Sequence, residues 1–319
     1  MTIAIRRYHF HCRWTSEARL PVYPGSTLRG AFGWALKKIS CMSRREDCAD
    51  CPLGDHCPYA WLFATKIAGE KTQSAVRPHP LLIQPGGETA GGAWNFSLLL
   101  IGGGDWAPFL IHSVNMMGES GIGAAAKRGA GRFVVEEVQR DGLLIYDGQT
   151  RRIADDAPPR LLSLTQTAGD PVMAVRLRLL TPLRLKQDNS LSAELPFSTL
   201  IRATLRRLSA LENVYGRDEH QGEHQGEPQL DYRGLIHRAE AVTMTASSLR
   251  WRQLQRYSNR QKQHVSLSGL MGEAAYAGAL DEFMPLLNYA AAVNLGKQTL
   301  FGLGRIEVEA IGRTAPIPA

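Results

Sequence analysis

The sequence contains no apolar run long enough to cross a lipid bilayer, which takes about 20 consecutive apolar residues. Its first residues, MTIAIRRYHFHCRW, alternate weakly like a β-strand and do not have the pattern of a signal peptide. We therefore expect a cytoplasmic protein with no membrane partner, in which thiols stay reduced. With 319 residues, of which 44% are hydrophobic, the chain is long enough to build two domains with separate cores.

Cysteine is also scarce, with five residues in the chain, yet four of them lie within residues 41–60. Clustered cysteines in a reducing compartment are typical of metal ligands, and chance clustering or a disulfide is the less favoured interpretation. The gaps between the four cysteines are six, two and five residues, in the order Cys41, Cys48, Cys51, Cys57. The fifth, Cys12, lies in the first predicted strand and is expected to be a core residue.

The spacing of these cysteines, with the tripeptide CPL inside it, resembles the loop that holds a four-iron cluster in endonuclease III-type DNA glycosylases. A single loop around one compact site suits a 4Fe-4S cluster, in which each iron takes one thiolate. A structural zinc site is the alternative, although such sites usually draw on two short-spaced pairs and only one C-x2-C is present. In both cases the metal would stabilise a loop that has no hydrophobic core of its own.

Motifs for binding nucleotides or paired magnesium ions are missing. The glycines near the C-terminus have neither the dinucleotide-binding spacing nor the P-loop spacing, and no GK[ST] stands in the right frame. The sequence also shows no clustered carboxylates of the kind that hold two magnesium ions. A nuclease built on this chain would therefore rely on side-chain chemistry.

The order of predicted elements is strand, helix, strand, strand, helix, strand, and it occurs twice. Helical spacing of apolar residues predicts helices at 26–40 and 196–211, the second with one apolar face formed by Phe197, Leu200, Ile201, Leu205, Leu208 and Leu211. The repeated order predicts an α+β protein of tandem ferredoxin-like (RRM-like) βαββαβ domains. We expect the domains at 1–150 and 171–319, a linker at 151–170, and the cysteine-rich segment 41–60 as an insertion in the first domain.

A basic segment free of acidic residues follows in the second half. The predicted hairpin around residues 259–261 has Trp251 and Tyr257 interleaved among five cations, Arg250, Arg252, Arg256, Arg260 and Lys262. Such a mixture suits phosphate contacts and base stacking. A charged hairpin edge that prevents aggregation is the alternative, but such edges usually mix both signs of charge. Glycines at Gly296, Gly302 and Gly304 either let the backbone approach a phosphate or simply form a tight turn.

Four segments, LRGAFG, CPYAWLF, RYSNRQK and LGKQTLFGLGR, together resemble the CRISPR-associated endoribonucleases of the RAMP superfamily, the Cas6 family. The resemblance runs over most of the chain and is strongest from about Ala241 to Ile306. It implies that the hairpin and the glycine loop bind a stem-loop of CRISPR repeat RNA. It also implies that the mature RNA stays bound and that the chain can join subunits of a CRISPR effector complex.

The resemblance implies cleavage without a metal, by attack of a 2′-hydroxyl on the adjacent phosphate to leave a 2′,3′-cyclic phosphate. That reaction needs a base, an acid and a cation, and histidine is the usual acid or base. The family commonly has a histidine in the first helix, but residues 26–40 contain none, and Asn294 stands where many relatives have another. The candidate catalytic residues are therefore Tyr257, His264, Lys297 and Arg29, followed by His9 and His11.

Two other functions fit parts of the sequence. The chain could be a non-catalytic RAMP subunit that binds CRISPR RNA in an effector complex with the same fold. A DNA glycosylase is suggested only by the cysteine loop, and the helix-hairpin-helix with its Lys and Asp that such enzymes carry is not found in the sequence.

Overall fold

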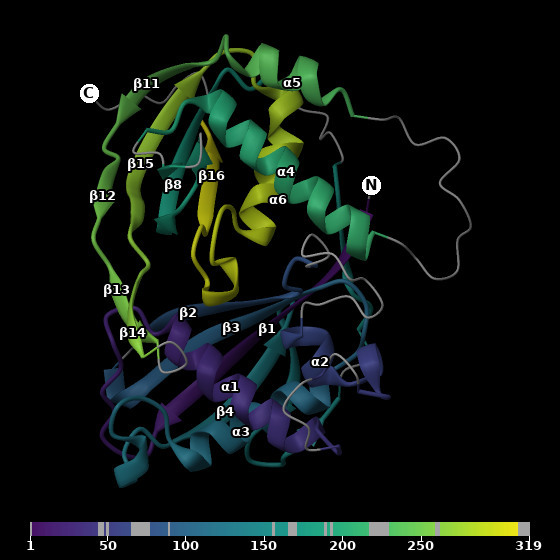
Figure 1. The fold of residues 1–319 in the computed structure, drawn as a ribbon, viewed down its shortest axis with the longest axis vertical. Helices are drawn as coiled ribbons and strands as arrows, with labels where there is room; N and C mark the ends of the chain where they lie inside the picture. The colour runs from purple at the N-terminus through teal and green to yellow at the C-terminus, as the bar shows by residue number, and fades with distance from the viewer. Residues whose placement is uncertain are drawn as a thin grey trace. The chain divides into compact units, whose positions relative to one another are not determined.

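The computed structural model describes residues 2–43, 48, 51–64, 77–88, 90–154, 157–164, 171–187, 190–191, 194–216, 230–258 and 262–311. The chain divides into two compact units, Ala4–Leu161 and Leu162–Ala319, the second joined by Met1–Ile3 (Figure 1). Arg260 and the duplicated tetrapeptide EHQG at 219–226 lie outside the described residues.

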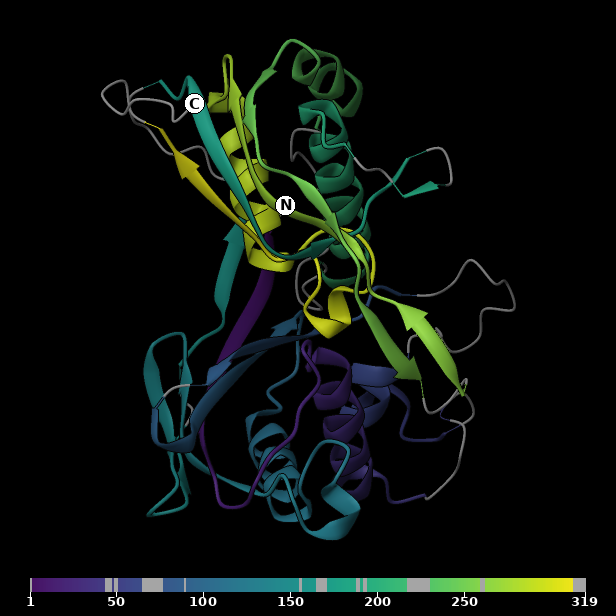
Figure 2. The ribbon, with the colours of Figure 1, turned by 90° about the vertical axis from the view of Figure 1, so that its left-hand side faces the viewer.

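The N-terminal unit is built on an antiparallel sheet whose central order is β2-β3-β1-β4. Its ferredoxin-like elements follow the predicted order: β1 (Thr2–Trp14), α1 (Gly25–Ser40), β2 (Leu81–Glu88), β3 (Ala93–Ile101), α3 (Ala107–Ser120) and β4 (Phe133–Arg140). The two helices pack against each other, and Figure 2 shows them on the same side of the strands.

The core of this unit lies between the helices and the sheet. Leu28, Phe32 and Leu36 of α1 are buried, and so is Phe10 of β1, whose ring stacks on Phe96 of β3 with a centroid distance of 5.1 Å. Burying one such large side chain stabilises the fold by roughly 1.5–3 kcal/mol. Cys12 is also buried, which confirms it as a core residue.

Three further strands extend the N-terminal sheet. β5 (Leu143–Asp147) pairs with β4, β6 (Arg152–Ile153) pairs with β5, and β7 (Arg160–Ser163) pairs with β1. β6 and β7 fall in the segment 151–170, where the sequence analysis expects a linker. Ile145 and Tyr146 of β5 are buried, so the hydrophobic sheet continues past the last strand that the ferredoxin-like pattern requires. The sequence around β6 and β7 is charged and contains prolines, so its pattern predicts a linker and not strands.

The C-terminal unit repeats the architecture with the sheet order β11-β15-β8-β16. β12 adds to the same sheet by pairing with β15. Its elements are β8 (Ala174–Leu183), α4 (Phe197–Tyr215), α5 (Tyr232–Ala239), β11 (Thr243–Ser247), β12 (Arg250–Arg252), β15 (Gly269–Ala277), α6 (Met284–Val293) and β16 (Ile306–Ala310). Two small ribbons stand beside it, formed by β9 (Lys186–Gln187) with β10 (Ser190–Leu191) and by β13 (Gln255–Ser258) with β14 (Gln263–Ser266).

Helix α4 shows how closely the apolar pattern determines packing. All six residues of its predicted apolar face are buried, and the helix runs on to Tyr215, which is buried as well. It packs against α5 and α6, and α6 packs against β16 (Figure 2). Although α4 has 19 residues, no helix within the described ranges is both long and apolar enough to span a membrane.

The remaining helical segments are short. They are α2 (Pro58–Phe63) and the 3-10 turns η1 (Gly54–His56), η2 (Ala90–Gly92), η3 (Ala126–Arg128), η4 (Asp281–Phe283) and η5 (Thr299–Phe301). Two segments are thus added to the tandem ferredoxin-like fold. One is the cysteine segment between α1 and α2, and the other is the loop around η5.

Candidate nucleic-acid interface

The basic hairpin predicted from the sequence is present. β11 and β12 pair with β15 inside the sheet, and β13 and β14 continue as a two-stranded ribbon (Figure 1). Where the ladder is interrupted, the Leu254 amide donates to Ser268 Oγ at 2.9 Å and the Leu267 amide donates to the Leu254 carbonyl at 2.8 Å. These bonds keep the two strands of the hairpin together in the gap between the sheet and the ribbon.

The cations of the hairpin lie in two different surroundings. Arg250 and Arg252 are exposed and line a hollow of about 610 Å³ together with Arg178 and Glu273. Arg178 forms an ion pair with Glu273 at 2.8 Å, so this hollow contains both signs of charge. Lys262 is exposed directly before β14, with a positive φ of 51°.

Arg256 lies elsewhere and is partly buried. Its guanidinium carbon is 4.8 Å from the centroid of the Phe301 ring, which belongs to η5 in the glycine loop. Burial lowers the pKa of Arg256, and its buried Nε has no hydrogen-bond partner among the described residues. This cation–π contact joins the hairpin and the glycine loop into one surface. In the sequence, only the resemblance to a known family connects the two segments.

Two of the candidate catalytic residues face each other on the hairpin. Tyr257 of β13 and His264 of β14 are cross-strand partners, with ring centroids 5.4 Å apart in an edge-to-face arrangement. Both are exposed, Tyr257 to 53%. A phenol and an imidazole held side by side at a solvent-facing site can share acid and base roles toward one substrate.

The other catalytic candidates are distributed over different elements. Lys297 follows the glycine at 296, and its backbone amide donates to the Arg184 carbonyl at 3.0 Å. Arg29 is on α1 in the N-terminal unit, with its guanidinium carbon 4.8 Å from the centroid of the Phe63 ring. Of the two histidines of β1, His9 hydrogen-bonds Ser97 Oγ at 2.8 Å, and His11 approaches Glu137 at 3.6 Å.

The glycines of the C-terminal loop determine its shape. Gly296, Gly302 and Gly304 all have positive φ, between 71° and 82°. A Cβ on Gly304 would come within 1.7 Å of the Leu295 carbonyl oxygen, so no other residue fits there. The amides of Gly302 and Gly304 donate to the carbonyls of Thr299 and Pro182 and are occupied within the protein. The assignment of these glycines to RNA binding stays a prediction.

Asn294, which stands directly before this loop, has a structural role. It is completely buried, has a φ of 56°, and its Nδ2 donates to the Leu303 carbonyl at 3.1 Å. The Leu295 amide donates to the Gly304 carbonyl at 2.9 Å and closes the loop beside it. Asn294 therefore fastens the two ends of the loop together and does not reach the surface.

The four cysteines of 41–60 lie in one neighbourhood of the N-terminal unit. Cys41 caps the C-terminus of α1 and Cys57 caps the N-terminus of α2. Ser43 Oγ is 3.8 Å from the Cys41 sulfur and 3.7 Å from the Cys51 sulfur. Burial raises the pKa of the Cys48 thiol, Lys37 lowers it, and the other three thiols raise it through their proximity. Within the described ranges, no three His, Cys, Asp or Glu side chains are placed to hold a metal ion.

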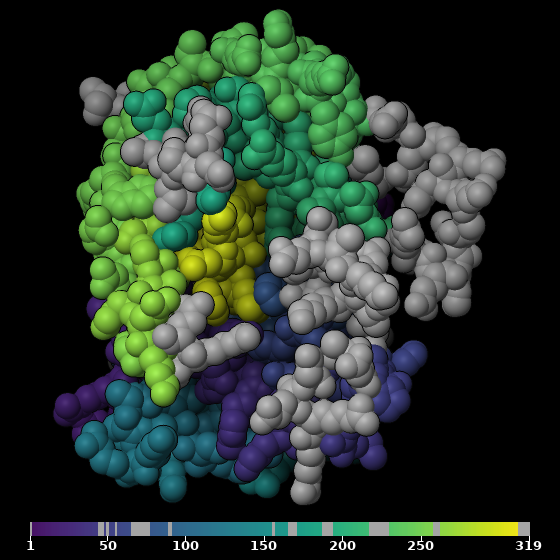
Figure 3. Space-filling model, viewed as in Figure 1, coloured from purple at the N-terminus to yellow at the C-terminus, as the bar shows by residue number. Residues whose placement is uncertain are grey.

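A second set of cations was missed by the sequence analysis. Lys297 lines one cavity together with Arg184 and Lys186, which follow β8, and with arginines of α4. The signal in the sequence is the run RATLRR, in which residues 202 and 206 share one side of the helix away from its apolar face. Figure 3 shows the C-terminal loop region, in yellow, at the surface between α4 and the strands of the hairpin.

Comparison with known proteins supports this architecture. The family model of the CRISPR-associated endoribonuclease Cas6 matches residues 177–306, and a second model, AF_1859_N, described as an N-terminal domain, matches residues 3–158. No curated protein sequence matches the chain.

Solved structures with the same fold are found over nearly the whole chain. Thermus thermophilus Cas6 has a TM-score of 0.52 at 14% identity, and the alignment covers 96% of this chain and 99% of that one. A product complex of Cas6 has a TM-score of 0.55 at 15% identity, covering 95% and 98%. A partial Cas6-RT-Cas1–Cas2 complex has a TM-score of 0.59 at 11% identity, and the alignment covers 99% of this chain but 48% of that one. Identities this low show the fold alone.

Two ferredoxin-like units in tandem, with a glycine loop before the last strand, form the same fold as these solved Cas6 structures. The match of the C-terminal unit to the Cas6 model is more specific than the fold. Over residues 177–306 the chain matches the CRISPR-associated Cas6 family, in agreement with the resemblance found in the sequence.

Proposed function

We propose that this chain cuts CRISPR precursor RNA within its repeats, at the 3′ base of a repeat stem-loop, and keeps the mature RNA bound. The observation that carries the proposal is the pair Tyr257 and His264, which face each other on a basic hairpin. The cation–π contact of Arg256 with Phe301 ties this hairpin to the glycine loop. The family match to an endoribonuclease and the similarity to a Cas6 product complex support the same activity.

The proposed reaction needs no metal. The 2′-oxygen of the nucleotide upstream of the cut attacks the adjacent phosphorus, the bond from phosphorus to the 5′-oxygen breaks, and a 2′,3′-cyclic phosphate and a 5′-hydroxyl result. A base takes the proton of the 2′-hydroxyl, and an acid protonates the leaving 5′-oxygen. Tyr257 and His264 are the candidates for these two roles. Lys297, with Arg29 in reserve, is the candidate for stabilising the negative charge of the transition state.

A repeat RNA with a 2′-deoxynucleotide just upstream of the cut tests this mechanism. The substitution removes the nucleophile, so cleavage in EDTA should disappear while binding persists. A matched RNA with the deoxynucleotide one position further upstream should still be cut. Cleavage of the first RNA at the normal site would mean that water attacks the phosphate, and the proposed mechanism would be wrong.

A non-catalytic RNA-binding subunit of an effector complex is the second candidate function. The absence of histidine from α1 and the buried, structural Asn294 favour it, because both positions where the resemblance places a histidine lack one. Incubation of the unmodified repeat RNA with the protein in EDTA separates the two functions. A single cut supports the enzyme, whereas a stable complex with intact RNA supports the binding subunit. In either function, effector-complex subunits are the proposed protein partners.

We also propose that the thiols of Cys41, Cys48, Cys51 and Cys57 bind a metal centre, a 4Fe-4S cluster or alternatively a structural zinc. Their support is positional, because α1 ends at the first thiol, α2 begins after the last, and each of the other three thiols raises the pKa of Cys48. Such a centre would supply folding energy to the connection between the two helices. It takes no part in the proposed cleavage.

A further inference from the structure

A cavity in the C-terminal unit is lined by an unusual number of cations. It has a volume of about 430 Å³ and lies between α4, the segment after β8 and the start of the glycine loop. We call it the cationic cleft and define it by its six basic lining residues, Arg184, Lys186, Arg202, Arg206, Arg207 and Lys297. None of the described residues that line it is acidic.

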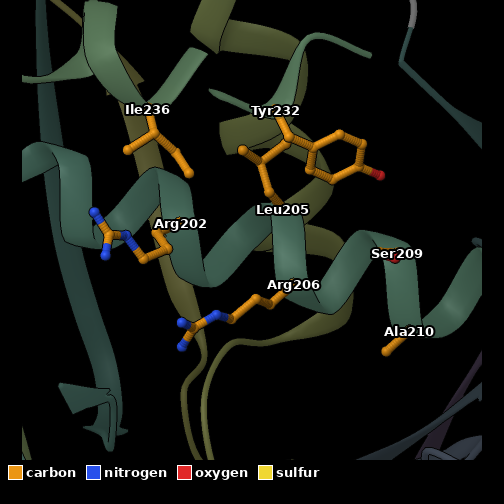
Figure 4. A pocket seen from close by; sticks show the side chains of 7 residues that line it. All are labelled: Arg202, Leu205, Arg206, Ser209, Ala210, Tyr232 and Ile236. Atoms are coloured by element: carbon orange, nitrogen blue, oxygen red, sulfur yellow. The ribbon is translucent and has the colours of Figure 1, made fainter. Parts of the chain in front are cut away.

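Arg202 and Arg206 form the exposed rim of the cleft. They are four residues apart on α4, and Figure 4 shows both guanidinium groups projecting from the same side of the helix. Both also border a neighbouring hollow of about 520 Å³ that Tyr232 and Ile236 of α5 complete. Two guanidinium groups one helical turn apart can contact the same phosphate group, with several N–H donors aimed at its oxygens.

The inner wall of the cleft adds positive charge that is partly withdrawn from water. Arg184 is 9% exposed, and Arg207 donates to the Val293 carbonyl at 3.3 Å. The buried Nε of each has no hydrogen-bond partner among the described residues. Burial lowers the pKa of Arg184, and it lowers that of Arg207 to about 10. Guanidinium groups of arginine stay charged at neutral pH in proteins.

Lys297 shows that these cations repel one another. Desolvation lowers the pKa of its ammonium group, and the nearby charges of Lys186 and Arg184 lower it further. Like charges held close together raise the free energy of the folded state, and a bound anion relieves that cost. The cleft is therefore built to receive a group with negative charge.

We infer that the cationic cleft holds a backbone phosphate of the bound RNA, so that the RNA path continues from the glycine loop onto α4. The inference rests on the proposed function, and it adds a binding surface that the hairpin does not provide. RNA is the occupant because the cleft includes Gly296 and Lys297, which begin the same loop that Phe301 links to the hairpin. Contacts to the phosphate would position the RNA and slow its release without reading its sequence.

The double variant Arg202→Gln/Arg206→Gln tests this inference. Gln keeps good helix propensity and removes both charges from the rim. With the 2′-deoxy repeat RNA as an uncleaved probe, we expect affinity to fall by about tenfold or more and the salt dependence of log K to become shallower by about one unit. The matched control, Arg160→Gln/Arg233→Gln, removes two exposed arginines outside the cleft and should bind like the wild type. Thermal unfolding of both variants establishes that they are folded.

A methylphosphonate scan of the RNA locates the phosphate. At one position, a neutral phosphate should weaken binding to the wild type but not to the double variant, because both changes remove the same contact. Wild-type affinity and salt dependence in the double variant would overturn the inference while leaving the proposed function intact. The absence of any position with this coupling would also overturn it. A wild type that neither binds nor cuts the repeat RNA would refute the proposed function and the inference together.

Discussion

At the scale of single residues, Arg256 differs from the other cations of its hairpin. Arg250 and Arg252 lie beside Glu273, whereas Arg256 packs over Phe301 and is partly withdrawn from water. A guanidinium stacked on a ring in this way is held in one orientation and loses little conformational freedom when it binds a phosphate. We therefore expect Arg256 to contribute more to RNA binding than its exposed neighbours.

Replacing Arg256 with Ala should weaken binding of the repeat RNA and reduce the salt dependence by about one phosphate contact. The same result is expected for Arg260→Ala. Arg238→Ala is the matched control, because Arg238 already forms ion pairs with Glu282 and Asp231 on a different surface. Equal affinity and equal salt dependence in both hairpin variants, measured by electrophoretic shift or fluorescence anisotropy, would show that the hairpin does not bind RNA.

The cross-strand pair makes a second prediction at this scale. Loss of a single general acid or base should slow cleavage about 10²–10⁴-fold, so His264→Ala or Tyr257→Phe should fall in this range under single-turnover conditions. Lys297→Ala and Arg29→Ala test the candidates for charge stabilisation in the same assay. If all four variants cut at the wild-type rate, the catalytic site lies elsewhere, and His9 and His11 are the next candidates.

At the scale of elements, the loop between α6 and β16 owes its shape to backbone geometry. Gly304 approaches the Leu295 carbonyl more closely than any side chain permits, and Asn294 bonds the Leu303 carbonyl. The loop positions Phe301 against Arg256 and Lys297 beside the cations after β8. Strain in this element should therefore affect both the hairpin and the cationic cleft.

Gly304→Ala should destabilise the C-terminal unit by more than about 1 kcal/mol, because it combines a positive φ with a collision against backbone. Gly30→Ala is the contrasting substitution, since Gly30 is inside α1 and a Cβ there would meet nothing within 4 Å. It should stabilise the protein by roughly 0.5–1 kcal/mol. Denaturant unfolding of both variants measures the difference, and a neutral Gly304→Ala would mean that the loop can relax.

At the scale of the whole molecule, two units with different sequences have the same βαββαβ order and the same antiparallel strand order. Only the N-terminal unit carries the cysteine segment, between its first helix and second strand. Because α2 has only six residues, it gains little stability from its own helical hydrogen bonds. A metal bound by the four thiols would stabilise this region.

Protein purified without oxygen should be brown and absorb broadly near about 400 nm if the site holds an iron–sulfur cluster. Colourless protein with stoichiometric zinc would assign the alternative metal, and protein with neither metal would contradict both. Cys48→Ser or Cys51→Ser should lower soluble yield more than it changes the cleavage rate, because the metal is proposed to be structural. Cys12→Ala, which alters the cysteine in the core of the sheet, should keep the full metal content.

The sequence by itself determined the order of the ferredoxin-like elements, the apolar face of α4 and the resemblance to the Cas6 family. These features depend on local periodicity and on short motifs, which act over one or two turns of helix or along one strand. It also singled out Tyr257 and His264, although their direct pairing depends on the register of the hairpin.

Only the tertiary structure decided which distant residues meet. Arg184, Arg202 and Lys297 belong to three different elements and become neighbours because β8, α4 and the glycine loop converge in one unit. The contact of Arg256 with Phe301 and the burial of Asn294 arise in the same way. Contacts of this kind depend on chain topology and side-chain packing, which no local pattern in the sequence specifies.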